Sequence, residues 1–536
     1  MIKKIYIKQW LELKPYNTQT LTDTYYLKLS NDIKTVLINS DSFVLMSHLT
    51  EIEFDILSCF LTSYFEDIIS ETNIWNTFIN CHTKLYNKKL PFFNTDEYYE
   101  NEINEQDISF LIWYFLNTIQ EEKYLKPYNN YVEDIAKEVT LLFDKEYEYA
   151  TENKHLKSFY AIDKNETDYY VVRNFINDIL FNTYLFFPDT ALKLQRQEEE
   201  LIKENDTHLS MYLRDIRDSS VHKNCTRLLS LKGNEWAAEI LGSEHPVSAD
   251  LLGMSQKING FFLYKGQNEQ DIFLEHIASG KKFDLTKKSF DHYRDLKKID
   301  DMVFMGIVQW KNEWWFSGIQ FQTKYDANVV LDEKNSIESR RAVDFLDNKK
   351  EDTITTLQKQ KDAFLSFNNG SPIVFLPSAD MNDFFSDYIE FYNKSLNLSV
   401  EDREQAEKRA KKEGYFGNKS NEMPNFAETS ETGLVFFNPK SGGEVALGVN
   451  SAFPFKTNPF FVAEDSENDI MQLLMDDSLS TELAMYCIDN FKNILPFLKE
   501  GDGKKYLDDI DFLLRFWKTE KYHSNPSITF VGQRKK

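Results

Sequence analysis

The most pointed chemical pattern in the sequence is an arginine followed five positions later by a histidine, Arg217 and His222. An imidazole can give or take a proton, and a guanidinium can stabilise negative charge that develops on a phosphate. The surrounding residues favour a helix, on which five positions correspond to about 500°, so the two side chains would stand about 140° apart. The spacing therefore does not place them on one face.

The segment from Arg217 to His222 resembles the R-x4-H signature of HEPN-type ribonucleases. That resemblance implies metal-independent cleavage of RNA, in which the 2′-hydroxyl attacks the adjacent phosphate, with Arg217 and His222 as the catalytic residues and two copies meeting across a dimer. A spacing of this kind is also expected roughly once by chance in a chain of this composition. In the alternative that we prefer, Arg217 pairs with a nearby carboxylate, Asp215 or Asp218, and His222 is an ordinary surface residue.

Three tryptophans, Trp310, Trp314 and Trp315, are candidate binding residues because they could form an aromatic surface. Aromatic side chains in strands more often pack in the core or across strands, and we prefer that interpretation. The loop from Asn438 to Glu444 contains a lysine and two adjacent glycines, but no helix pattern follows it. A hairpin turn is therefore the better interpretation of this loop than a phosphate-binding site.

These tryptophans belong to a stretch, Asn259 to Gln322, that carries the clearest β pattern in the chain. The pattern predicts a small, strongly bent antiparallel barrel, SH3-like or OB-like. Val303 to Gln309 and Trp314 to Phe321 read as a hairpin with Lys311 and Asn312 at its tip. Gly306 interrupts the first of these strands and predicts a bulge or a close contact.

The remaining chain places this β module between two other parts. Residues 1–240 show helical spacing, and residues 325–536 mix helical and strand patterns, including a hairpin around the 438–444 loop. We therefore predict an α+β multidomain protein with a helical domain at 1–240, the β module at 256–324 and an α+β domain at 325–536. The charged and weakly patterned stretch from Asp326 to Asp352 is predicted to be a linker or surface excursion.

Composition bounds the class of protein. The chain has 536 residues, a formal net charge of −24 and 42% hydrophobic residues, which favours a soluble protein and argues against broad contact with nucleic-acid phosphates. Its four cysteines are scattered, so we expect reduced thiols, no metal site and a cytoplasmic location. The sequence shows neither a membrane-spanning run nor a cofactor motif such as G-x-G-x-x-G.

Three longer motifs carry a second resemblance: WLELKPY at Trp10–Tyr16, TDTYYLKL at Thr22–Leu29, and FFNPKSGGEVALGVN at Phe436–Asn450. They are similar to an uncharacterised bacterial family known only as a domain of unknown function, and this resemblance implies no activity. Because the sequence shows no strong catalytic constellation, we predict an interaction protein that binds an unknown protein or peptide through the β module or an adjacent groove. Whether it is also an enzyme stays open, with the ribonuclease as the alternative.

Overall fold

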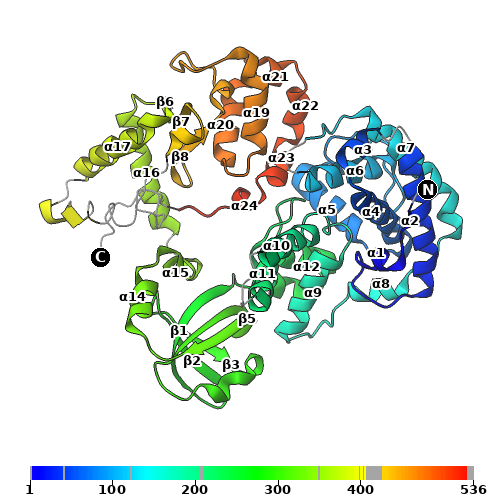
Figure 1. Cartoon of the computed structure of the whole chain (residues 1–536), viewed down its shortest axis with the longest axis horizontal. Coiled ribbons are helices and arrows are strands. Elements are labelled where there is room, and N and C mark those ends of the chain that lie inside the picture. Colours follow the sequence, from blue (N-terminus) through cyan, green and yellow to red (C-terminus); the bar gives the residue numbers. More distant parts are fainter. Residues whose placement is uncertain are drawn as a thin grey trace. The chain divides into compact units, whose positions relative to one another are not determined.

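The computed structural model describes residues 3–39, 43–120, 124–203, 209–347, 350–396, 399–402, 404–405, 408 and 425–527 (Figure 1). By the density of its internal contacts the chain divides into two compact units, Met1–Ala342 and Val343–Lys536. Helices make up the N-terminal half and two separate sheets follow, which confirms the mixed helix-and-sheet plan.

The first unit begins with a helical part in which long apolar helices supply the core. Helix α4 starts at a capping box, where Thr50 and Glu53 satisfy each other's backbone N–H groups. Helices α4 and α6 are buried on almost every side. The helices of this part are α1 (Ile7–Leu11), α2 (Leu21–Asn39), α3 (Phe43–His48), α4 (Glu51–Ser70), α5 (Ile74–Tyr86), α6 (Glu105–Ile119), α7 (Asn130–Glu146), α8 (Lys154–Phe159), α9 (Tyr169–Asn182), α10 (Ala191–Lys203), α11 (Leu209–Lys223), α12 (Gly233–Leu241) and α13 (Pro246–Leu252).

The two N-terminal motifs fasten the first residues of the chain to these helices. The indole Nε1 of Trp10 and the hydroxyl of Tyr16 both donate to Asp23, over 2.8 and 2.9 Å. The ammonium of Lys14 pairs with Glu66 on α4, and both side chains are almost fully buried. A buried charge is tolerated when it is paired and hydrogen-bonded. The motif residues therefore act within the core rather than at a surface.

The predicted β module forms a sheet whose pairings close into a ring in the order β1-β2-β3-β5-β4, with β4 returning to β1. Its strands are β1 (Ile258–Gln267), β2 (Asp271–His276), β3 (Lys282–Thr286), β4 (Met302–Trp310) and β5 (Glu313–Thr323). Four pairs are antiparallel, and β3 meets β5 in parallel through Leu285 and Trp314.

Two sequence predictions within this closed sheet are confirmed. The hairpin between β4 and β5 turns at Lys311 and Asn312, both with positive φ, as a two-residue hairpin turn requires. The register shifts between Met305 and Gly306, which is the predicted bulge. A Cβ on Gly306 would lie 2.3 Å from both Lys257 Cε and the carbonyl oxygen of Ser317, so only glycine fits there.

The stretch from Asp326 to Asp352, which we expected to be a linker or surface excursion, contains two helices, α14 (Ala327–Asn335) and α15 (Ile337–Arg341). Asp326 caps α14 by accepting from the backbone N–H of Asn328. Val330 of α14 packs against Met302 of β4 and Ile277, the residue that follows β2. This tertiary contact stabilises a helix whose own apolar pattern is weak. The boundary between the two compact units falls within the same stretch, after Ala342.

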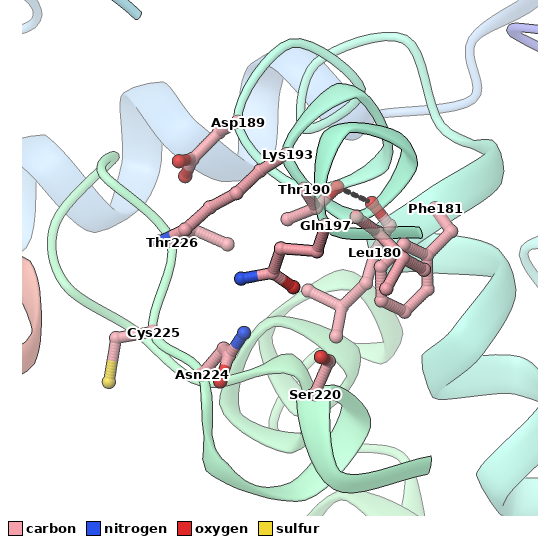
Figure 2. A pocket seen from close by; sticks show the side chains of 11 residues that line it. Leu180, Phe181, Asp189, Thr190, Lys193, Gln197, Ser220, Asn224, Cys225 and Thr226 are labelled. Atoms are coloured by element: carbon pink, nitrogen blue, oxygen red, sulfur yellow. Dashed lines mark hydrogen bonds between the residues drawn. The ribbon is translucent and has the colours of Figure 1, made fainter. Parts of the chain in front are cut away.

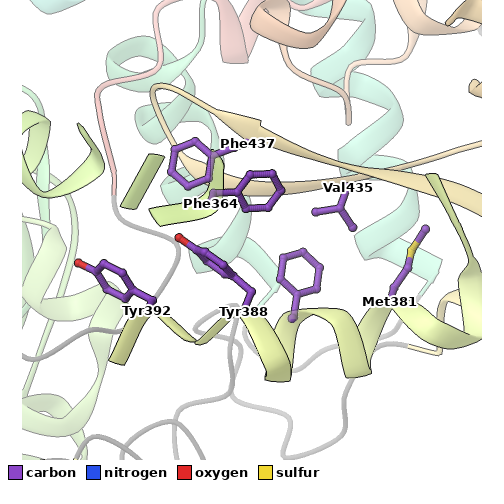
Figure 3. Close-up of a cluster of buried hydrophobic side chains, with 7 residues drawn as sticks. Phe364, Met381, Tyr388, Tyr392, Val435 and Phe437 are labelled. Carbon is purple, nitrogen blue, oxygen red and sulfur yellow. The ribbon is translucent and has the colours of Figure 1, made fainter. Parts of the chain in front are cut away.

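The second unit surrounds a three-stranded antiparallel sheet in the order β6-β7-β8. Met381, Phe385 and Tyr388 of α17 pack on Val435 of β7 and Phe364 of α16 in the cluster that Figure 3 shows. The predicted hairpin around residues 438–444 is confirmed. The elements of this unit are α16 (Lys350–Phe367), β6 (Ile373–Pro377), α17 (Met381–Ser395), β7 (Thr432–Asn438), β8 (Gly442–Leu447), α19 (Ser466–Met475), α20 (Thr481–Phe491), α21 (Pro496–Lys499), α22 (Gly503–Tyr506), α23 (Ile510–Trp517) and α24 (Thr519–Tyr522).

The part of the chain that the structure describes contains neither a membrane-spanning helix nor a metal-binding cluster. Within those residues, no helix has the length and apolar character needed to cross a membrane. Nor do the described histidines, cysteines and carboxylates form any group of three or more that could hold a metal ion.

Candidate functional site

His222 belongs to a buried polar cluster where α9 and α11 meet the closed sheet, beside β5 (Figure 1). We call this set the junction cluster; its members are Tyr169, Arg173, Asp218, His222, Lys257 and Ser317. The helices contribute four of these side chains, and the sheet contributes Ser317 of β5 and Lys257, the residue immediately before β1.

Asp218 is the charged centre of the junction cluster. Its Oδ2 lies 2.6 Å from the Nζ of Lys257, and its Oδ1 lies 2.6 Å from the Nη2 of Arg173. The side chains of Asp218 and Lys257 are both fully buried. Burial acts to raise the pKa of Asp218, but attraction to Lys257 and Arg173 outweighs it and holds the pKa below its ordinary value. The carboxylate is therefore ionised and paired.

Ser317 links this ion pair to His222. Its hydroxyl lies 2.9 and 3.0 Å from the two carboxylate oxygens of Asp218, 2.7 Å from the Tyr169 hydroxyl and 3.3 Å from His222 Nε2. Burial lowers the pKa of His222 to about 4, so its imidazole is neutral near pH 7. In a nucleophilic triad the carboxylate orients the imidazole, and the imidazole activates the serine. Here Asp218 contacts the serine directly, so the three side chains do not have the order of a triad.

Glycine makes the close approach of Lys257 possible. Gly318 has a φ of +92°, and a Cβ there would lie 2.7 Å from Lys257 Nζ and 3.0 Å from Asp218 Oδ2. Together with the bulge at Gly306, this leaves a channel through which the lysine side chain reaches α11. Five members of the junction cluster are buried and the Arg173 side chain is 24% exposed, and their mutual hydrogen bonds and ion pairs fasten the sheet to the helices.

The structure does not bring Arg217 to this cluster. Arg217 is exposed, and its Cζ lies 5.6 Å from the centre of the Phe181 ring. His222 instead hydrogen-bonds to Tyr169. Tyr169 and Phe181 lie twelve positions apart on α9, which corresponds to about 18 Å along the helix. The two predicted catalytic residues thus face different ends of α9.

Both details of our preferred structural alternative need correction. We expected His222 to be an ordinary surface residue, but only 7% of it is exposed. We expected Arg217 to pair with Asp218 or Asp215, but Arg173 and Lys257 occupy Asp218, and Lys257 also lies 3.2 Å from Asp215. The reason is that Lys257 lies 39 positions or more along the chain from both carboxylates, so local spacing gave no sign of it.

The three candidate tryptophans mostly face the protein interior. Trp310 is 1% exposed and donates from Nε1 to the backbone carbonyl of Thr167, over 3.1 Å. Trp315 is 5% exposed, with its ring centre 5.9 Å from that of Tyr169. Trp314 is half-buried against Phe283. These positions fit the packing interpretation that the sequence favoured.

A different set of aromatic side chains lies on the outer face of the closed sheet. Phe261 of β1 pairs directly with Phe304 of β4, which in turn pairs with Phe321 of β5. Their ring centres lie 4.8 to 5.5 Å apart, and Phe304 and Phe321 are stacked. We call these three residues the aromatic row. Sequence reasoning missed it, although each phenylalanine alternates with residues that face the other side of its strand.

Comparison with known proteins identifies a family for this chain. A family model described as "Protein of unknown function (DUF3843)" matches residues 4–276, which run from the N-terminal segment to the end of β2. No curated protein matches the chain, and no solved structure matches it. The match therefore identifies a family without supplying a function. The comparison does not show the resemblance to HEPN ribonucleases.

Proposed function

The chain belongs to the DUF3843 family of proteins of unknown function. From the geometry of the closed sheet we propose that the chain is an interaction protein whose aromatic row binds a protein or peptide partner. The site acts by contact rather than by catalysis. The partner contributes apolar side chains that cover the phenylalanines of β1, β4 and β5. This keeps the binding surface on the β module, where the sequence predicted it.

The observation that carries the proposal is the exposure of the aromatic row. Phe321 is 38% exposed, and Phe261 and Phe304 are partly exposed beside it. Burying an aromatic side chain contributes much of the energy of a protein interface, and adjacent aromatic residues form its usual centre. Three directly paired phenylalanines on neighbouring strands therefore supply a contiguous anchor for apolar groups.

The attachment of the closed sheet to the helical part supports the same role. Besides the junction cluster, Lys311 at the hairpin tip donates to the carbonyl of Glu166 over 2.7 Å. The hydroxyl of Tyr170 on α9 donates to the carbonyl of Ser289 over 2.8 Å. A surface that is already ordered loses little conformational entropy when a partner binds.

Several finer parts of the sequence interpretation belong to this proposal. We keep the closed sheet as an SH3-like or OB-like barrel, and we keep residues 256–324 as the module that binds, between 1–240 and 325–536. We also keep the cytoplasmic location, which we infer from the scattered positions of the four cysteines in the sequence. No cofactor enters the proposed interaction.

The ribonuclease alternative gains no support from the described residues, because Arg217 and His222 have different neighbours and His222 is buried. Incubation of the protein with single-stranded RNA and transfer RNA tests it directly. We expect no cleavage without added metal. Cleavage that disappears in Arg217→Ala, an exposed position at which the fold should survive, would establish an enzyme instead.

The interaction itself is tested by selecting peptides from a random display library on the immobilised full chain. We expect peptides rich in apolar and aromatic residues, with binding measured by fluorescence polarisation. Phe321→Ser should weaken that binding about tenfold or more, as loss of a central aromatic contact does. Gln322→Ser, the adjacent exposed residue on the opposite side of β5, is the control and should bind normally. Equal binding by both variants would reject the aromatic row as the site.

A further inference from the structure

A small pocket lies in the first unit away from the aromatic row. Its walls come from the end of α9, from α10, and from the end of α11 with the loop that follows it (Figure 2). All of these elements lie within residues 4–276, the region that the family model covers. Neither the junction cluster nor the proposed interaction uses this pocket.

Three polar side chains line the pocket without a hydrogen-bond or ion-pair partner among the described residues: Lys193 and Gln197 on α10, and Asn224 just after α11. Figure 2 shows the amides of Gln197 and Asn224 facing each other across the pocket, while the thiol of Cys225 points away. Lys193 and Gln197 are four positions apart, so they share one face of α10. Groups of this kind, left unpaired at a concave surface, are available to a ligand.

Charge around the pocket favours an anion. Asp189 is the one carboxylate in its lining, and it accepts from the backbone N–H of Arg227, whose guanidinium lies nearby. Arg217 lies over Phe181, which is part of the pocket wall. Asp189 and Asp178 attract Lys193 and Arg217 respectively and offset part of this positive charge. The ammonium of Lys193 is the cationic group among the residues that line the pocket.

The rest of the lining is apolar. Leu180 and Phe181 from the end of α9 and Leu194 from α10 supply hydrocarbon surface beside the polar groups. Ligand pockets commonly combine such a surface with a few convergent polar groups that fix orientation. A molecule that fits all of these contacts carries one anionic group and a compact apolar body.

We propose that this pocket binds a small organic anion. Lys193 pairs with the anionic group, the amides of Gln197 and Asn224 hydrogen-bond to its oxygens, and Leu180, Phe181 and Leu194 contact its apolar body. A carboxylate and a phosphate monoester share this chemistry. This proposal does not depend on the aromatic row, so an experiment can reject either proposal without affecting the other.

The test uses three probes with the same ring: benzoate, phenyl phosphate and benzamide, titrated into the full chain by isothermal calorimetry. We expect saturable binding of benzoate or phenyl phosphate, and whichever binds more tightly identifies the anionic group. Lys193→Met should weaken that binding about tenfold, since a charged hydrogen bond is lost. Lys203→Met, an exposed lysine on the same helix outside the pocket, should leave it unchanged.

Three outcomes would overturn the proposal. The first is that neither anion binds saturably at millimolar concentration. The second is that benzamide binds as tightly as the anions, because the ammonium would then play no part. The third is that Lys193→Met and Lys203→Met weaken binding equally, which would indicate general attraction to surface charge.

Discussion

Replacing Lys257 by methionine removes the ammonium that neutralises Asp218 and keeps a side chain of similar length in the channel beside Gly306 and Gly318. Lys257 and Asp218 are both fully buried, with 2.6 Å between Nζ and Oδ2. Removing one partner of such a pair costs about 3–5 kcal/mol, because the other charge is left buried. Arg173 still contacts the other carboxylate oxygen. We therefore expect the free energy of unfolding to fall by about 3 kcal/mol.

Urea denaturation followed by tryptophan fluorescence measures this loss, because every tryptophan except Trp517 lies in Met1–Ala342. Lys265→Met is a matched control on β1: that lysine pairs with Asp300 at a half-exposed position, and its loss should cost less than about 1 kcal/mol. Loss of Lys257 also leaves burial free to raise the pKa of Asp218. Protonation then favours the folded state, so the Lys257→Met variant should regain stability as the pH falls.

Two results would refute this reasoning. If Lys257→Met and Lys265→Met lose equal stability, the buried pair contributes no more than a surface contact. If the Lys257→Met variant shows the same pH dependence of unfolding as the unmodified chain between pH 5 and 8, Lys257 is not what holds the pKa of Asp218 low against its burial. In either case the junction cluster would not be what fastens the sheet to the helices.

Three further predictions follow from other buried groups and from the boundary of the family match. Burial raises the pKa of Asp107 to about 7, so its contribution to the free energy of unfolding falls by up to about 4 kcal/mol as the pH rises from about 4 to 7. Urea denaturation across this pH range should show that Asp107→Asn removes this pH dependence. A chain ending at His276 splits the closed sheet and should be insoluble or protease-sensitive, whereas one ending at Ala342 should give a sharp thermal transition by circular dichroism; equal behaviour would contradict the sheet topology. Native alkylation followed by mass spectrometry should label the half-buried Cys225 well before Cys59, whose pKa burial raises to about 12; the reverse order would contradict the burial pattern.

Local patterns in the sequence were enough to predict the parts of the fold that depend on neighbouring residues. The hairpin at Lys311 and Asn312 was predictable because a short polar break separates two strand-like runs, and both residues adopt the positive φ that such a turn requires. The bulge at Gly306 is visible because a glycine interrupts a strand. The wheel angle between Arg217 and His222 correctly indicated that they do not share a face, as their different contacts on α9 show.

Contacts between distant residues escaped prediction. Lys257 meets Asp218 across 39 positions, and Ser317 meets it across 99. Nothing near Lys257 distinguishes it from an ordinary surface lysine, since its burial depends on glycines in β4 and β5. The aromatic row was missed for a similar reason: the register of three strands decides which phenylalanines become neighbours. The helix α14 depends in the same way on packing against the sheet.

Hydrogen exchange measured by mass spectrometry, with and without a selected peptide, tests the proposed function most directly. The account predicts that peptide binding slows exchange in β1, β4 and β5 around Phe261, Phe304 and Phe321, and that Phe321→Ser abolishes this protection. Protection confined to another surface, such as the pocket around Lys193, or protection unchanged in Phe321→Ser, would contradict the account.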